Sequence, residues 1–381
     1  MKIDCIFKAE RSHDECEQLI ERIDFADSLS GNSNVIVEYE RLLANYFKTK
    51  HAIAVSSGTA ALHAGLSETI NPGDEVLVPA ICVPMTIAAV LQAGGVPVFY
   101  DCQIDSFKPS VISLDAMRSA KTKALITVSM WGYPAIDLQI KTYASEKNLV
   151  IIEDTAPGAG TKNSGRYEGT FGDIGCFSTH EFKMISTGEG GFILTDDDRH
   201  AENVRSFAHI GFSKAEGSFG FRTGLNYKLS SLQASLGISQ LNILDEKMTK
   251  RRRKIALWQS YILQNIDMSF FNASADFNHN GYSLCCLINN TEHINAKGLA
   301  NELYIHGINT DTHRYKNSIV AAYPFVREYY NSPRYSCIIK KDFPNAAALL
   351  NRLLVLPCHE AITEGDIIMA TKKMSLIVSG K

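Results

Sequence analysis

Short apolar runs rich in β-branched residues alternate with longer helix-like segments from about residue 50 to 245. In chain order the runs read HAIAVSSG, DEVLVPA, PVFYDC, KALITVSMWG, LVIIEDTA, IGCFSTH and GFILTD. Because they are almost continuously apolar, they are typical of strands that helices cover on both faces. This alternation predicts an α/β fold with a mostly parallel central sheet.

The pattern changes near residue 230. Residues 230–266 form one long helical pattern, which predicts a connection between two domains. The segment from about 280 to 381 has a strand-like GYSLCCLIN, a helix from about Ile294 and a terminal helix after Thr363, which predicts a smaller α+β domain. We therefore expect an N-terminal arm and large domain over residues 1–245 and a small C-terminal domain over residues 246–381.

Composition and charge limit which partners and which cellular location we expect. The formal net charge of -3 gives no bulk attraction to nucleic acid or an anionic membrane, and the basic run from Lys250 to Lys254 indicates a solvated helical face. No apolar run reaches the roughly 18 residues of a membrane helix, and the opening MKIDCIFKAERSHDE lacks the apolar core of a secretory signal. Nine cysteines show no CxxC spacing, so we expect no metal site and a reducing, cytoplasmic location.

Three motifs lie where strands are expected to end, which is where open α/β sheets bind ligands. In SSGTAAL, Gly58 leads from a strand into a helix start whose free N–H groups, with the Thr59 hydroxyl, suit a phosphate. Asp154 ends the run IIEDTA, and a buried carboxylate there needs a partner such as a protonated pyridine nitrogen. Lys183 precedes a glycine-rich turn, and a lysine beside a phosphate and a cationic ring can form an imine with an aldehyde.

Each motif taken alone has an ordinary explanation. A capped helix start, an acid that caps the next turn and a surface lysine near a tight turn would show the same residues. Their occurrence together, in this order, favours a cofactor site.

Several segments resemble one known family. SSGTAAL, GDEVLVP, the run from WGYP to IIEDTA, FSTHEFKMISTGEGG, GLNYKLSSLQASLGISQL and VLPCH are similar to the DegT/StrS-type sugar aminotransferases, which are fold-type I enzymes dependent on pyridoxal 5'-phosphate (PLP). The resemblance covers roughly residues 30 to 370. It implies a homodimer with shared active sites and PLP as the cofactor.

The resemblance also implies a role for each matched residue. Lys183 would form the imine with PLP and then carry the proton, while Asp154 would keep the pyridine nitrogen protonated. Asn226 would reach the phosphate in the other subunit of the dimer. The other matched residues at the cofactor are Gly58, Thr59, Ala60, Ser178 and His180, and those at the substrate are His313 and Tyr315.

Two positions and one stretch depart from the family pattern. Val83 stands where the family has an aromatic ring that stacks on the cofactor. Pro157, which has no side-chain donor, stands where the family has a glutamine at the phenolic oxygen. The family's HYxPLH stretch appears as residues 313–318, which keep the first histidine and lose the second.

The expected reaction moves an amino group from an amino-acid donor, glutamate, to a ketone on a nucleotide-linked sugar. Pyridoxamine phosphate would connect the two halves, which predicts ping-pong kinetics. Three alternatives remain open. One is a ketone without a nucleotide, such as a cyclitol or a natural-product intermediate. Another is a deoxysugar dehydratase, a branch that carries histidine in place of Lys183, and the last is a regulatory protein with an inactive cofactor pocket.

Overall fold

The computed structural model describes residues 3–7, 12–220, 222–271, 277–316, 318–331 and 342–380. Position 317 of the HYxPLH-like stretch and Cys337 lie outside the described residues. A seven-stranded sheet forms the centre of the molecule. Its strands, in spatial order, are β1 (His51–Val55), β9 (Gly191–Thr195), β8 (Ile174–Ser178), β5 (Val150–Asp154), β4 (Thr122–Val128), β2 (Glu75–Pro79) and β3 (Val96–Tyr100).

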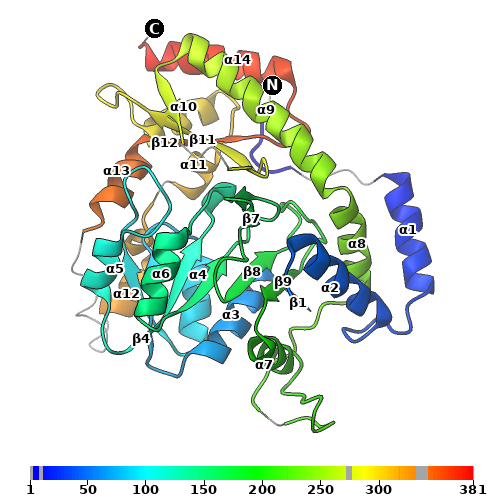
Figure 1. Cartoon of the computed structure of the whole chain (residues 1–381). Helices are drawn as coiled ribbons and strands as arrows, with labels where there is room; N and C mark the ends of the chain where they lie inside the picture. Colours follow the sequence, from blue (N-terminus) through cyan, green and yellow to red (C-terminus); the bar gives the residue numbers. More distant parts are fainter. Residues whose placement is uncertain are drawn as a thin grey trace.

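All neighbouring strands from β8 to β3 are parallel, whereas β9 is antiparallel to both β8 and β1. The expected α/β fold with a mostly parallel sheet is therefore confirmed. Helices cover the sheet on both faces (Figure 1). They are α2 (Asn34–Phe47), α3 (Gly58–Thr69), α4 (Pro84–Gln92), α5 (Val111–Met117), α6 (Leu138–Glu146) and α7 (Asp198–Ala208).

Strand β2 illustrates why the sheet sequences are continuously apolar. Val76 and Val78 pack into the core beneath α3 and α4, whereas Leu77 between them belongs to the core on the opposite face. Successive side chains of a strand point to opposite faces, so a strand covered on both sides needs apolar residues at every position.

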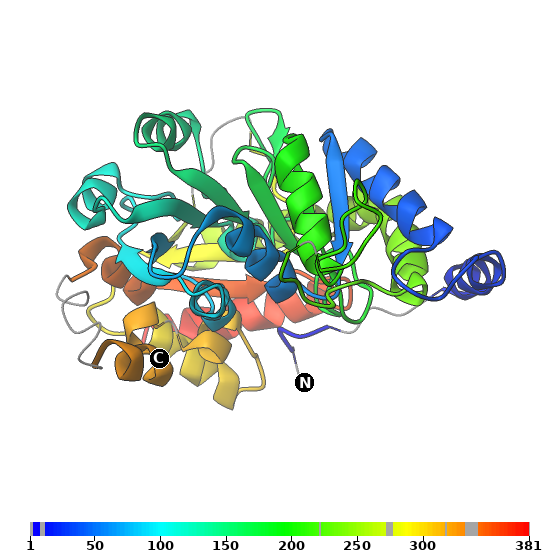
Figure 2. The same ribbon diagram turned by 90° about the horizontal axis from the view of Figure 1, so that it is seen from below.

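A smaller antiparallel sheet lies alongside the large one (Figure 2). It contains β10 (Met268–Phe270), β11 (Ser283–Ile288) and β12 (Leu353–Pro357). Helices α10 (Ala296–Ile305) and α14 (Glu364–Val378) accompany it. Short elements complete the C-terminal part: α11 (Asp311–Tyr315), η2 (Val320–Ala322), α12 (Pro324–Asn331) and α13 (Pro344–Arg352).

The single long helix expected over residues 230–266 is two helices, α8 (Ser231–Asn242) and α9 (Leu244–Asn265). Ile243, at φ -101° and ψ 3°, departs from helical geometry between them. Helix α9 contributes Leu244 to the core of the large sheet and Trp258 to the core of the small one. Helix α9 thus crosses the domain boundary predicted at residue 245. The division into two domains stays a prediction.

The N-terminal residues associate with the opposite end of the chain. Ile3 forms a β-bridge with Ile308, and the Asp4 carbonyl oxygen lies 2.7 Å from Nε2 of His359. Helix α1 (His13–Asp24) packs instead against α8 and projects at one end of the molecule (Figure 2). Among the described residues, no helix is long and apolar enough to cross a membrane.

Candidate active site

A cavity of about 350 Å³ opens where the parallel strands end. Val128, Asp154 and Ser178 are the last residues of β4, β5 and β8, and all line it. The opposite wall comes from the C-terminal half of the chain. The lining residues are Ser57, Gly58, Thr59, Leu62, Val83, Met85, Val128, Met130, Trp131, Asp154, Ala156, Pro157, Ser178, His180, Phe182, Lys183, Glu189, Tyr282, Asp311, Arg314 and Tyr315.

The N-terminus of α3 forms one end of the cavity. Ser57 caps the helix, because its Oγ accepts a hydrogen bond of 3.0 Å from the N–H of Ala60. Gly58 allows α3 to approach β8 closely: a Cβ there would lie 2.8 Å from Cβ of Ser178. The first turn of a helix leaves N–H groups unpaired, so this end of the cavity suits an anion, with Thr59 as a further donor. Ala60 is buried behind the turn and does not line the cavity.

Asp154 lies deep in the cavity, with 2% of its surface exposed. Its Oδ2 accepts a hydrogen bond of 2.7 Å from Oγ1 of Thr86, and its Oδ1 accepts one of 3.3 Å from the N–H of Ala156. Burial raises the pKa of Asp154, because few water molecules can stabilise its charge there. A cationic ligand would lower this pKa again and keep the carboxylate ionised.

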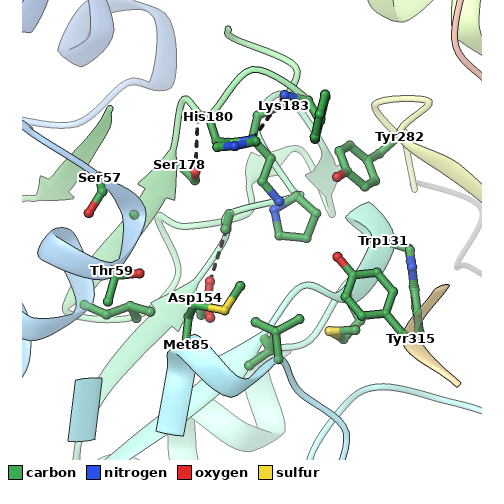
Figure 3. Close-up of a pocket in the computed structure, with 18 of the residues that line it drawn as sticks. Ser57, Thr59, Met85, Trp131, Asp154, Ser178, His180, Lys183, Tyr282 and Tyr315 are labelled. Carbon is green, nitrogen blue, oxygen red and sulfur yellow. Dashed lines mark hydrogen bonds between the residues drawn. The ribbon is translucent and has the colours of Figure 1, made fainter. Parts of the chain in front are cut away.

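Lys183 enters the cavity from the turn between β8 and β9 (Figure 3). Its backbone N–H donates to the carbonyl of His180 at 2.8 Å, which fixes the start of the turn. Its ammonium lies 5.3 Å from the ring centre of Tyr282. Burial lowers the pKa of Lys183, which favours the neutral amine that acts as a nucleophile.

These groups fit PLP. An anion site for a phosphate, a buried carboxylate for a protonated ring nitrogen and a lysine of lowered pKa line one cavity (Figure 3). Without such a ligand, the buried carboxylate of Asp154 would lack the cationic partner that stabilises its charge.

Of the remaining residues predicted for the site, some line the cavity and others lie outside it. Val83, Pro157, His180 and Tyr315 line the cavity, but His313 does not. The ring of His313 stacks on Tyr304 at 4.0 Å, and its Nδ1 lies 3.1 Å from Oδ1 of Asn301. Asn226 is exposed and lies outside the cavity of its own chain.

Helical geometry explains the placement of His313. Residues three and four positions apart share one face of a helix, so Asp311, Arg314 and Tyr315 of α11 face the cavity together. His313 lies on another face. This spacing was present in the sequence and could have identified Asp311 and Arg314, which the motif comparison passed over.

Other residues of the site were harder to recognise from the sequence. Thr86 is completely buried and bonded to Asp154, but a threonine after an apolar run has no distinguishing pattern. Trp131 belongs to the WGYP segment, and Met85 follows Val83 by two positions. Tyr282 comes from a segment far along the chain, which only the folded structure brings to Lys183.

Comparison with known proteins shows the family. The DegT/DnrJ/EryC1/StrS aminotransferase family matches residues 11–374, nearly the whole chain. The chain belongs to this family. The resemblance inferred from the motifs is thus confirmed, and this DegT/DnrJ/EryC1/StrS family member is a PLP-dependent aminotransferase.

Relatives of known name and structure cover most of the chain. GDP-perosamine synthase of Escherichia coli O157:H7 is 28% identical over 354 residues, which are 93% of each protein. The structure of DesI in the presence of its TDP-sugar product is 25% identical, with a TM-score of 0.86 over 98% of this chain and 93% of that one. An aminotransferase from Psychrobacter cryohalolentis, at 22% identity and a TM-score of 0.84 over 98% of both chains, has the same fold.

Proposed function

We propose that this protein transfers the amino group of an amino acid, glutamate, to the keto group of a nucleotide-linked sugar. The observation that carries the proposal is the meeting of Lys183, Asp154 and the N-terminus of α3 in one cavity. The names of the relatives support the acceptor class, because GDP-perosamine synthase and DesI with its TDP-sugar product both refer to nucleotide sugars.

Each residue would contribute a separate action. PLP, when bound, supplies an electron sink for the negative charge that develops on the reacting carbon. Lys183 accepts the proton of that carbon at Nζ and returns it, which its lowered pKa permits. Asp154 holds the ring in its cationic form, while Thr59 and Ser178 hold the phosphate beside α3. Trp131 and Tyr315, which also line the cavity, reduce the access of water to the reacting carbon.

The proposal includes a homodimer whose active sites are shared. Asn226 would bind the phosphate in the partner subunit, and its exposed position outside its own cavity supports this role. The surrounding segment presents exposed apolar side chains, among them Ile210, Phe219 and Leu225, which a second subunit could cover. The proposed location is the cytoplasm, in keeping with the free thiols of the described cysteines.

Isotope-labelled glutamate tests the reaction. We expect the purified holoenzyme to transfer the label to one or more members of a panel of GDP-, TDP- and UDP-linked ketosugars, with ping-pong kinetics and formation of 2-oxoglutarate, as measured by mass spectrometry. Lys183→Ala should form no labelled product, whereas Lys121→Ala, at an exposed lysine outside the cavity, should retain activity.

The same experiment separates the alternatives. If glutamate converts the cofactor but no nucleotide sugar accepts the label, the acceptor assignment is wrong and ketones such as cyclitols should be tested next. Borohydride should fix PLP to the peptide that contains Lys183. Fixation to another lysine would overturn the assignment of the cofactor site.

A further inference from the structure

Asp311 is a second buried acid in the cavity, and neither the cofactor nor the proposed chemistry accounts for it. It begins α11, lines the same cavity as Lys183, and its side chain is 10% exposed. Its Oδ1 is buried and has no hydrogen-bond partner among the described residues. Buried carboxylate oxygens normally accept hydrogen bonds, because an unmet one costs free energy. The free oxygen therefore indicates a missing donor.

The neighbours of Asp311 do not supply a donor to Oδ1. The Cys5 thiol and the Trp131 indole lower the pKa of Asp311, but among the described residues none donates a hydrogen bond to Oδ1. The closest cation, Nη1 of Arg314, lies 3.8 Å from Oδ1, which is too far for a hydrogen bond. Arg314 instead extends over the rings of Tyr315 and Phe182, at 5.2 and 6.0 Å from their centres. Burial raises the pKa of Asp311 to about 6, although the positive charges of Arg314 and Lys183 favour its charged form. At neutral pH Asp311 is thus mostly an anion, which can only accept hydrogen bonds.

The missing donor must come from a molecule that enters the cavity. The carboxylates of an amino-acid donor would be repelled by the negative charge of Asp311. Hydroxyl groups are neutral and can donate to a carboxylate. The aromatic walls made by Trp131, Tyr282 and Tyr315 would pack against the carbon skeleton of such a ligand.

We propose that Asp311 is a specificity-determining residue whose free carboxylate oxygen accepts a hydrogen bond from a hydroxyl group of the ketone acceptor. The inference rests on the proposed function and narrows it, since the acceptor must carry a hydroxyl group within reach of Asp311 when its keto group lies at Lys183. The hydrogen bond to Asp311 forms in the acceptor half of the reaction alone, because glutamate has no corresponding hydroxyl.

The test combines two enzymes with two acceptors. Wild type and Asp311→Ala are compared on an accepted ketosugar and on its analogues that each lack one ring hydroxyl. For one analogue, the kcat/KM of wild type should be on the order of tenfold to a hundredfold lower than for the parent ketosugar. The kcat/KM values of Asp311→Ala for these two substrates should differ by less than about threefold. Asp311→Asn, which keeps a neutral acceptor oxygen, should fall between them. The half-reaction with glutamate, followed by absorbance, should not slow in either variant, because each removes a negative charge that repels the carboxylates of glutamate.

Binding gives a readout that does not depend on turnover. Trp131 lines the cavity, whereas Trp258 is fully buried in the core of the small sheet, so a fluorescence change on adding the ketosugar reports on Trp131. Without glutamate, the holoenzyme should bind the ketosugar at least roughly tenfold more weakly after Asp311→Ala. Asp14→Asn on the exposed surface of α1 serves as the charge control.

Two results would overturn the inference while leaving the proposed function intact. One is a wild-type enzyme that uses every deoxy analogue as well as the parent sugar. The other is an Asp311→Ala variant that loses both half-reactions equally, which would make Asp311 a structural acid. Failure of wild type on every nucleotide ketosugar would instead contradict the proposed function, and the analogue comparison would then be made with the ketone that it does use.

Discussion

Asp154 and Asp311 are both buried in the cavity, and their hydrogen bonds distinguish their roles. Asp154 accepts from Thr86 and from the backbone of Ala156, so the protein holds its carboxylate in one orientation. None of the described residues donates a hydrogen bond to Oδ1 of Asp311. A fixed carboxylate suits a resident ring, whereas an open one suits a ligand that enters and leaves during each turnover. Burial raises the pKa of both acids, but only Asp154 is expected to have a permanent cationic partner.

Asp154→Asn should preserve the fold, because the two side chains are nearly the same size. Without the anion the cofactor ring loses its proton, so both half-reactions should slow by orders of magnitude in single-turnover absorbance measurements. Thr86→Val keeps the shape but removes one hydrogen bond to Asp154, and it should slow them roughly tenfold. Near-normal rates in Asp154→Asn would show that this carboxylate serves the structure alone.

At the scale of elements, a strained loop forms one wall of the cavity. Trp131 in η1 (Met130–Gly132) has φ 51° and Gly132 has φ 86°. The carbonyl of Trp131 accepts a hydrogen bond of 3.1 Å from Nε2 of His279, whose pKa burial lowers to about 4, so that the ring is neutral. Asn280 donates to the carbonyls of Pro157 and Ala159 at 2.8 and 3.0 Å. One short segment therefore fixes two walls of the site.

Gly132→Ala tests this arrangement. A Cβ at Gly132 would lie 2.6 Å from Oδ1 of Asn280, and the positive φ adds strain. We expect the free energy of unfolding to fall by about 3 kcal/mol and kcat/KM to fall with it, as measured by urea denaturation at constant protein concentration and by steady-state kinetics. Gly73→Ala is the matched control, because Gly73 has φ 92° but no atom of the described residues within 4 Å of the added Cβ. The Gly73→Ala variant should lower the free energy of unfolding by about 1 kcal/mol and leave kcat/KM unchanged. Equal effects of the two variants would contradict the role of Asn280 in supporting the loop around Trp131.

The elements also show what could be predicted from the sequence. The strands of the large sheet were recognisable because a doubly covered strand must be apolar throughout, as in β2. The interruption at Ile243 was not, since an isoleucine in an apolar helical pattern gives no signal of a break. Motif matching located Lys183 and Asp154, whose side chains the expected amino-group transfer requires. It missed Asp311, Trp131 and Tyr282, because their importance depends on contacts between distant segments.

At the scale of the whole molecule, the shared active site leads to a complementation experiment. Asn226→Ala and Lys183→Ala each damage a different component if Asn226 serves the partner's site. Hybrid dimers of the two variants would then contain one site with both defects and one intact site. Random pairing of equal amounts makes about half of the dimers hybrids, so the mixture should regain roughly a quarter of the wild-type activity. The measurement is turnover after mixing, unfolding and refolding the two variants together.

A second mixture provides the control for complementation. Lys183 and Asp154 line the same cavity of one chain, so hybrids of Lys183→Ala with Asp154→Asn should contain no intact site and regain no activity. Recovery in this control, or its absence in correctly formed hybrids with Asn226→Ala, would show that Asn226 does not serve the partner.

The bridge between Ile3 and Ile308 has a consequence for synthesis on the ribosome. Asp4 and its hydrogen-bond partner Asn309 are 305 residues apart, and the carbonyl of Asp4 has another partner in His359. At about 5 to 20 residues per second, Asp4 waits roughly 15 to 60 s for Asn309 to be made. The large sheet can form during that interval, because every strand in it precedes residue 196. Ile3 and Asp4 are therefore translated before the large sheet but reach their final positions after it can form.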